Sequence, residues 1–355
     1  MKICVYAISK NEEKFVKRWY NSVKEADKVY VLDTGSTDNT VNLLKECGVI
    51  VKQEVIKPWR FDVARNLSLD MVPIDTDICV CTDLDEVMEK GWRKKLEEVW
   101  KDDVTRAAYT YNWKLINGKP VISFYLDKIH KRKGYRWTHP VHETLTYDGD
   151  EVKILNEDIV VDHFPDESKS RSSYLPLLEL SVKEDPLDDR NMHYLGREYM
   201  YYGKWNEAID TLIKHLNLER AIWKDERCAS MRFIGRCYLN LNRPLEAEMW
   251  YKKAIDEAPH LKEPYSELGL FYYKMGKYEE AKDLFLKALN IKQGYKSYIT
   301  EYFSKDFYIY DVLSICEYYL GNFEKSLEYI DKALQITKDP RIIENRNLIS
   351  KKIDI

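Results

Sequence analysis

A repeated pattern in the second half of the chain constrains its fold more than any other feature. Four segments there, which begin "YLGREY", "FIGRCY", "ELGLFY" and "VLSICE", each carry a small residue that is followed twelve positions later by another. The first small residues are Gly196, Gly235, Gly269 and Ser314, and the second are Ala208, Ala247, Ala281 and Ser326. The pattern predicts units of two antiparallel helices that approach closely at these positions.

The spacing of the units predicts the class of helical array. Gly235 and Gly269 lie 34 residues apart, and the two flanking intervals are 39 and 45 residues. A helix-turn-helix repeat of about 34 residues is typical of tetratricopeptide repeats, and residues 190–355 resemble such a domain with about four units. Such an array has an extended concave surface that usually binds peptide or protein. Its faces could instead pack against the first domain or against a second copy of the chain.

The first half of the chain follows a different pattern. Short apolar runs alternate with amphipathic helical segments, from "KICVYAI" at the start to "DICVCTD" at residues 77–83. This alternation predicts an α/β domain with a mostly parallel sheet, Rossmann-like in its order of elements, over residues 1–168. Residues 169–189 are expected to form a linker or helical connection to the repeats at 190–355.

Composition and charge exclude several classes of protein. A net charge of -4 gives no indication that nucleic acid or an anionic membrane is the main partner. No apolar run approaches the roughly 18 residues of a membrane span, so we expect a soluble cytoplasmic protein with no membrane partner. The seven cysteines include no CxxC pair, which indicates reduced, buried thiols rather than a zinc or redox site.

Two polar segments follow predicted strands. In "YVLDTGSTDNT", Asp33 ends a strand, and turn and capping residues lead from it into a helix. In "CTDLDEV", Asp83 and Asp85 follow another strand. Ligands of open α/β sheets bind beyond the carboxyl ends of the strands, so we expect a binding site here, with the backbone amides of Gly35 to Asp38 free to meet a polar ligand. An ordinary capped turn is the alternative for the first segment.

The two aspartates predict a cation. Because Asp83 and Asp85 are two residues apart on an extended chain, their carboxylates should point the same way. Two anions on one side repel unless a cation lies between them and a phosphorylated group. A hard divalent ion held by one or two carboxylates and by substrate phosphates fits this arrangement.

Four segments together resemble a known family. "AISKNEE", "DTGSTDNT", "FDVARNLSL" and "DLDE" resemble, in order and spacing, a family 2 glycosyltransferase of the GT-A fold. With "HPVHE", "VDHFPDESKSR" and the repeats, the chain is similar to bacterial family 2 enzymes with C-terminal tetratricopeptide repeats, a group that includes peptide S-glycosyltransferases acting on bacteriocins. The QxxRW motif and membrane helices of many processive members are missing from the sequence, which argues against a polymer-extruding synthase.

The resemblance implies a set of residues that bind the donor. Nucleotide-sugar contacts are expected from Ser9, Asn11, Glu12, Asp33, Arg65, Asp83 and Leu84. Asp33 and Arg65 would lie at the uracil or the neighbouring ribose, and a planar guanidinium suits such a contact, although Arg65 could also be a solvated helix residue. Asp85 would bind the Mn²⁺ or Mg²⁺ that bridges the diphosphate, with Asp83 on the ribose and metal side.

Two residues further along are candidates for the chemistry of transfer. An inverting transfer needs a carboxylate that takes the proton of the acceptor, and the resemblance places Glu143 of "HPVHE" at the sugar and acceptor end of the site. We expect Glu143 to act as this base or to orient the sugar. His163 could complete the metal shell, because neutral imidazole accepts an ion such as Mn²⁺. A purely structural histidine is the alternative.

The sequence thus predicts a metal-dependent inverting glycosyltransferase that moves a hexose from a UDP-sugar to a peptide or protein acceptor recruited by the repeats. One alternative is transfer to a glycan or small molecule. Another is a catalytically inert repeat scaffold that binds a nucleotide sugar, although such a scaffold has no physical reason to gather anions around an unneutralised cleft. The linked acceptor atom and a homodimer are left open.

Overall fold

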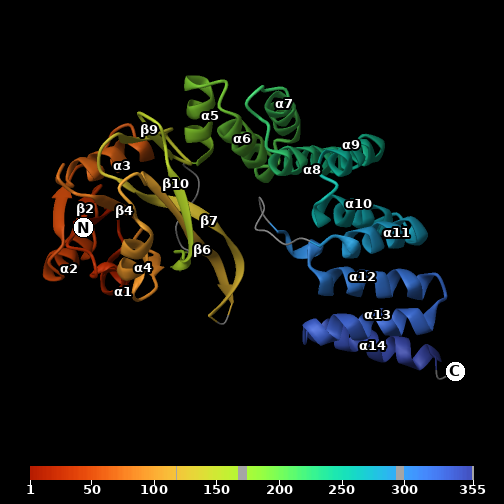
Figure 1. Cartoon of the computed structure of the whole chain (residues 1–355). Coiled ribbons are helices and arrows are strands. Elements are labelled where there is room, and N and C mark those ends of the chain that lie inside the picture. The colour runs from red at the N-terminus through yellow and green to blue at the C-terminus, as the bar shows by residue number, and fades with distance from the viewer. Residues whose placement is uncertain (117, 167–173, 293–299, 354–355) are drawn as a thin grey trace. The chain divides into compact units, whose positions relative to one another are not determined.

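The chain folds into two compact units, Met1–Glu184 and Asp185–Ile355. The structure, a computed structural model, describes residues 1–116, 118–166, 174–292 and 300–353 (Figure 1). Part of the segment expected to be a linker, residues 169–173, lies outside the described residues. Helix α5 (Tyr174–Glu184) belongs to the first unit, so the division between the units falls inside the segment 169–189.

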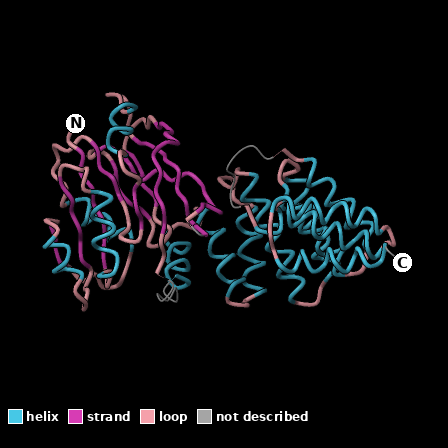
Figure 2. Tube along the Cα trace, turned by 90° about the horizontal axis from the view of Figure 1, so that it is seen from below, coloured by secondary structure: helices cyan, strands magenta, loops and turns pink. Residues whose placement is uncertain are grey.

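The first unit contains the strands of the described chain, as the magenta segments of Figure 2 show. Its strands are β1 Ile3–Ser9, β2 Lys28–Asp33, β3 Ile50–Gln53, β4 Ile78–Cys81, β5 Glu86–Met88, β6 Arg106–Ile116, β7 Lys119–Lys131, β8 Tyr135–Thr138, β9 Thr144–Tyr147 and β10 Lys153–His163. Its other helices are α1 Glu13–Val23, α2 Thr40–Glu46, α3 Phe61–Asp70 and α4 Trp92–Val99. The predicted alternation of strands and helices up to β4 is confirmed.

Eight strands form one sheet in the order β3-β2-β1-β4-β7-β6-β10-β5. Strand β1 runs parallel to β2 and β4, and β2 runs parallel to β3. The carboxyl ends of these strands therefore meet at one edge of the sheet. Strand β7 enters antiparallel between β4 and β6, and β10 pairs parallel with β6 and antiparallel with β5. This mostly parallel α/β sheet confirms the predicted fold class.

The central strands bury apolar side chains on both faces of the sheet, and successive side chains of a strand alternate between these faces. Ile3, Val5 and Ala7 of β1 belong to one apolar cluster, which also contains Trp19 of α1. Cys4 and Tyr6 belong to the cluster on the other face. The cysteines of β4 are free and fully buried, as expected from the sequence.

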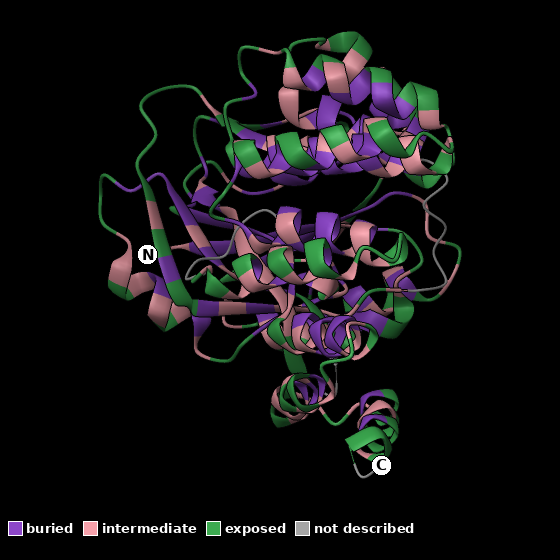
Figure 3. Ribbon diagram, turned by 90° about the vertical axis from the view of Figure 1, so that its right-hand side faces the viewer, coloured by how far each residue is buried: buried purple, intermediate pink, exposed green. Residues whose placement is uncertain are grey.

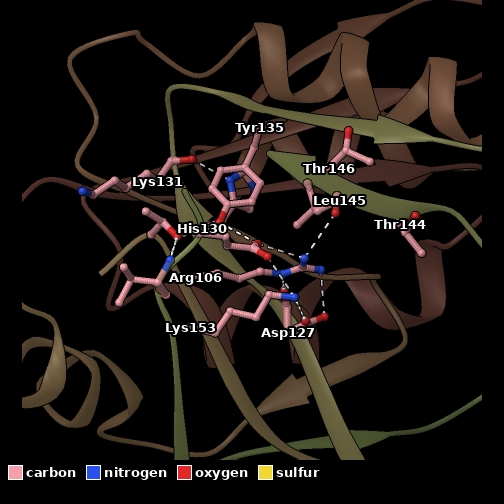
Figure 4. Close-up of polar contacts among 12 residues, drawn as sticks. Arg106, Asp127, His130, Lys131, Tyr135, Thr144, Leu145, Thr146 and Lys153 are labelled. Carbon is pink, nitrogen blue, oxygen red and sulfur yellow. Dashed lines mark hydrogen bonds and ion pairs between the residues drawn. The ribbon is translucent and has the colours of Figure 1, made fainter. Parts of the chain in front are cut away.

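A buried arginine ties the small sheet of β8 and β9 to the main one (Figure 4). The Arg106 side chain donates to the backbone oxygen of Asp127 at 2.7 Å, to its carboxylate at 2.8 Å, and to the backbone oxygen of Leu145 at 3.2 Å. Arg106, Asp127 and Leu145 lie on β6, β7 and β9. Because β9 starts directly after Glu143, these contacts also fix the position of the "HPVHE" segment.

The second unit is an array of helix pairs. Its elements are α6 Asp189–Tyr201, α7 Trp205–Leu216, α8 Lys224–Asn240, α9 Pro244–Glu257, α10 Lys262–Lys274, α11 Tyr278–Asn290, the 3-10 helix η1 Tyr302–Ser304, α12 Asp306–Tyr319, α13 Phe323–Ile336 and α14 Pro340–Ile353. Consecutive helices pack in pairs from α6 with α7 to α12 with α13, each with a buried and an exposed side (Figure 3). Among the described helices of the whole chain, each is too short or too polar to cross a membrane.

The small residues of the repeat lie where paired helices touch, as the pattern predicts. A Cβ atom on Gly235 of α8 would lie 2.6 Å from the Tyr251 ring of α9, and one on Gly196 would lie 2.5 Å from Leu212. In the last pair, the Ser326 hydroxyl donates to the backbone oxygen of Ser314 at 2.7 Å. Glycine at these positions allows the two helix backbones to approach.

Gly235→Ala should therefore destabilise the second unit by about 1–3 kcal/mol, the usual effect of an overpacked core. Alanine gains about 1 kcal/mol of helix propensity over glycine, but the ring of Tyr251 is only 1% exposed and has little room to move. Urea unfolding of the intact chain measures the change. Gly269→Ala is the matched control, because its nearest ring atom lies at 3.0 Å and a smaller loss is expected. An unfolding midpoint for Gly235→Ala at or above that of the unmodified chain would contradict the packing argument.

Candidate active site

The carboxyl ends of β1 and β2 place Ser9 and Asp33 side by side, because these two residues are register partners. The Ser9 hydroxyl donates to one carboxylate oxygen of Asp33 at 3.0 Å, and the hydroxyl of Ser36 donates to the same oxygen. The other oxygen accepts the backbone amides of Gly35 at 3.2 Å and Ser36 at 3.0 Å. Asp33 is fully buried. Its hydrogen bonds to Gly35 and Ser36 stabilise the turn after β2.

The expectation that the amides of Gly35 to Asp38 are free is wrong for three of them. The amides of Gly35 and Ser36 bind Asp33, and the amide of Thr37 donates to the side-chain oxygen of Asn11 at 2.7 Å. The physical reason is that the chain supplies its own acceptors, as Asx turns commonly do. In this arrangement a nucleotide base can reach the Asp33 carboxylate only by replacing one of its donors.

The loop after β1 is fastened to the loop after β2. Asn11 has a left-handed backbone, with φ of 54°, and its amide donates to the Ser36 hydroxyl at 2.8 Å. The amide of Glu12 donates to the hydroxyl of Thr40, the first residue of α2, at 2.7 Å. The predicted nucleotide-pocket residues Ser9, Asn11 and Glu12 are therefore brought together with Asp33, which is the arrangement that a pocket at this edge requires.

The two aspartates after β4 lie in a turn, which corrects the expectation of an extended chain. The Glu86 amide donates to the backbone oxygen of Asp83 at 3.0 Å, and β5 starts at Glu86. The carboxylates of Asp83 and Asp85 contact different partners. Leu84 between them is 1% exposed and belongs to the apolar core, so only its backbone could contact a nucleotide sugar.

Arg65 of α3 is the central cation of the site. It is 3% exposed, which rules out the solvated helix position. Its Nη2 lies 2.6 Å from Asp83, its Nε donates to Glu143 at 3.0 Å, and its Nη1 lies 3.6 Å from the sulfur of Cys81. Burial alone would lower the pKa of Arg65, but the two carboxylates outweigh burial and hold it well above its usual value. The guanidinium thus orients Asp83 and Glu143.

Lys128 is a site residue that the sequence did not reveal. It lies on β7, beside β4, and its ammonium is 3.2 Å from Asp83 and 3.3 Å from Glu86. Burial would raise the pKa of Asp83, but Arg65 and Lys128 hold it below its usual range. Burial raises the pKa of Glu86. The only sequence signal was a lysine inside an apolar strand, and nothing in the sequence indicated that β7 pairs with β4.

Glu143 lies where the chain bends between β8 and β9. His139 and His142 have left-handed backbones, with φ of 75° and 49°, so this segment is not extended. The bend directs one oxygen of Glu143 to Arg65 at 3.0 Å. Glu143 and Asp83 are thereby brought to one guanidinium from distant parts of the chain.

Asp85 and His163 form a second pair at the same edge. His163 ends β10 and is the register partner of Glu86, the first residue of β5. Its Nε2 lies 3.4 Å from the carboxylate of Asp85, and its Nδ1 donates to the backbone oxygen of Trp113 at 3.1 Å. Burial would lower the pKa of His163, but Asp85 outweighs burial and raises it. Because Nδ1 carries the proton of this hydrogen bond, Nε2 is the ring nitrogen that faces Asp85.

The donor set fits a divalent ion with few protein ligands. Within the described residues, no group of three or more His, Cys, Asp or Glu side chains is arranged to hold a metal. Both oxygens of Asp83 contact cations, so Asp83 is a poor ligand in this arrangement. Asp85 and His163 offer an oxygen and a nitrogen ligand. Mg²⁺ and similar ions are commonly held by one or two protein groups together with substrate phosphates.

Comparisons with known proteins agree with the two units. Residues 4–146 match the glycosyl transferase family 2, and residues 233–261 and 263–295 match tetratricopeptide repeat families. An uncharacterized glycosyltransferase of Rickettsia typhi is 22% identical over 255 residues, which are 72% of this chain and 76% of that protein.

Two further relatives are matched over a smaller share of their own length. The SPbeta prophage-derived glycosyltransferase SunS of Bacillus subtilis is 24% identical over 254 residues, 66% of this chain and 57% of SunS. The human protein O-mannosyl-transferase TMTC1 is 31% identical over 134 residues, 31% of this chain and 15% of TMTC1. The chain therefore spans less than two thirds of both relatives. With the sheet and the repeats described above, these matches show that the chain has a family 2 glycosyltransferase domain over residues 4–146, followed by tetratricopeptide repeats.

Proposed function

We propose that this protein is a metal-dependent inverting glycosyltransferase that moves a hexose from a UDP-sugar to a peptide or protein acceptor held by the repeats. The observation that carries the proposal is the pair of Asp85 and His163 beside the ion-paired Asp83, at the carboxyl edge of the mostly parallel sheet. This edge is where open α/β sheets bind their ligands. The name of TMTC1 describes transfer to protein, which supports a protein acceptor.

Each residue of the site has a proposed task. Asp85 and His163 would hold Mn²⁺ or Mg²⁺, which when bound stabilises the negative charge of the leaving diphosphate. Arg65 and Lys128 keep Asp83 ionised and fixed, so that it can meet the ribose side of the nucleotide. The wall of the nucleotide pocket would be formed by Ser9 and Asp33, at the ends of β1 and β2, and by Asn11 and Glu12 from the loop after β1.

Glu143 is the proposed base or sugar-orienting residue. As base, its carboxylate would accept the proton of the acceptor group while that group attacks the anomeric carbon from the side opposite the leaving diphosphate. The ion pair with Arg65 fixes the direction of the carboxylate, and a fixed direction is what proton transfer in a transition state requires.

The proposed function is tested by mass spectrometry of peptides. The intact protein is incubated with Mn²⁺, mixed UDP-sugars and peptides from a lysate, and we expect a hexose on particular peptides that is missing from reactions with Asp85→Ala. Fragmentation of the labelled peptides identifies the linked atom. A hexose found only on glycans or small molecules would replace the acceptor in this proposal. No transfer and no UDP-sugar hydrolysis under these conditions would favour the inert scaffold.

A further inference from the structure

Two arginines of α8 form a carboxylate-binding site in the second unit. Arg232 and Arg236 are one helical turn apart, so their side chains share a face. Both contact Glu267 of α10, with Arg232 at 3.2 Å. Both also contact Glu301, whose two oxygens lie 3.0 and 2.9 Å from Nη2 of Arg236. Burial would raise the pKa of Glu301, but the two guanidinium groups outweigh it and lower that pKa.

The two carboxylates differ in origin. Glu267 belongs to a repeat helix, whereas Glu301 precedes η1 in the stretch between α11 and α12. The interval from Gly269 to Ser314 is 45 residues, compared with 34 between Gly235 and Gly269. Glu301 is therefore part of an insertion that the repeat itself does not need. Without it, the two guanidinium groups would lose one of the carboxylates that neutralise them, and a buried unpaired charge is costly.

The inserted stretch also supplies an aromatic ring. The ring of Phe303 makes cation–π contacts with both arginines. Its centre lies 5.7 Å from the guanidinium carbon of Arg236 and 6.0 Å from that of Arg232. The Ser304 hydroxyl donates to Glu263 of α10 at 2.9 Å. The inserted stretch thus indicates the kind of ligand that this surface binds. Such a ligand has a carboxylate that contacts the two arginines and an aromatic ring two residues later.

Open space continues beside this contact. A cavity of about 540 Å³ is lined by residues that include Arg236, Leu239, Phe271, Lys274, Glu301 and Phe303. The lining is mixed, with apolar walls and a second cation in Lys274. Nε of Arg232 is buried and has no hydrogen-bond partner among the described residues. The site therefore has room for a ligand beside the contact that Glu301 makes with Arg236.

We propose that Arg232, Arg236 and the adjacent cavity bind an acceptor peptide through an acidic residue followed at the second position by an aromatic one. Glu301 and Phe303 hold this site when no peptide is bound. The inference rests on the proposed function, because it names the class of acceptor that the repeats hold. Because Glu301 and Phe303 belong to the same chain, they compete with a peptide at an effective concentration in the millimolar range. Only a peptide that binds more tightly than this stretch displaces it.

The test measures binding of a labelled peptide to the intact protein by fluorescence anisotropy, without UDP-sugar or metal. The probe has the sequence of residues 300–306, "TEYFSKD", and a second probe has glutamine in place of its glutamate. Glu301→Gln combined with Phe303→Ala should bind the first probe at least about tenfold more tightly than the unmodified protein does, because the competitor is removed. The glutamine probe should bind at least about tenfold more weakly to this variant. Glu279→Gln, at an exposed glutamate of α11, is the matched control and should behave like the unmodified protein.

Two results would overturn the inference. One is a folded double variant, judged by its thermal transition, that binds neither probe or binds both equally. If the double variant does not fold, Phe303→Ala alone keeps the ion pairs, and no gain in probe binding by that variant also overturns it. Asp85→Ala should bind the probe as the unmodified protein does. Failure of the proposed function would therefore appear in the transfer assay, and failure of this inference in the anisotropy.

Discussion

Asp85→Ala is expected to reduce the rate of sugar transfer at least about 100-fold while leaving the free energy of unfolding almost unchanged. In the proposed function Asp85 contacts a metal ion, a contact worth several kcal/mol in the transition state, and each 1.36 kcal/mol is a factor of about ten in rate. Asp85 is only partly buried and its carboxylate contacts His163 at 3.4 Å, so its removal disrupts little packing. Initial rates of UDP release with Mn²⁺ and the thermal transition measure the two quantities.

The matched control for this change is Glu89→Ala. Glu89 is an exposed acid just beyond β5, 3.9 Å from Lys95, and removing it should leave the transfer rate within a factor of about two. Transfer by Asp85→Ala at nearly the original rate with metal present would remove Asp85 from the proposed metal site.

Arg65→Met should destabilise the first unit by about 3–5 kcal/mol, the usual cost of removing one partner from a buried ion pair. Glu143 loses the cation 3.0 Å away, whereas Asp83 keeps Lys128, so the lower end of this range is expected. Arg65→Lys should recover part of the loss, because a lysine is a single point charge and cannot bridge both carboxylates as the planar fork does. Urea unfolding of the intact chain, followed through the transition of the first unit, measures the effect.

The dependence of stability on pH gives a second test of this ion pair. Because the pKa of Asp83 is depressed in the folded state, its stabilisation is present above the unfolded pKa of about 3.9 and is lost as pH falls through the folded value. This loss should be smaller in Arg65→Met.

Arg136→Met is the control substitution. It removes an exposed ion pair with Asp70 and should change stability by less than about 1 kcal/mol. Normal stability with weakened UDP binding in Arg65→Met would instead make Arg65 a direct nucleotide ligand.

The strands up to β4 and the helix pairs were predictable because their signals are local. A short apolar run marks a buried strand, and paired small residues mark a close contact between two helices, wherever the rest of the chain lies. The contacts of the site depend on pairing between distant segments. Lys128 reaches Asp83 because β7 pairs with β4, and His163 reaches Asp85 because β10 pairs with β5. No periodicity in the sequence determines these registers.

The turn after β2 shows a different limit. Its composition predicted a turn that leads into a helix, and the structure has both. The sequence did not indicate that Asp33 and Asn11 would bind the turn amides themselves. Several side chains and a ligand can compete for the same donors, and the outcome depends on distances that only the folded chain determines.

The turn between β4 and β5 joins two aspartates that are anchored independently. Asp83 is held by α3 and β7 through Arg65 and Lys128. Asp85 is held by the end of β10, through His163 and through its backbone oxygen, which accepts the Phe164 amide at 2.8 Å. A shift at the end of β10 would therefore move Asp85, the proposed metal ligand, and leave Asp83 in place. If the proposed function holds, substitutions there would alter the ion preference of the protein without rebuilding its recognition of the donor.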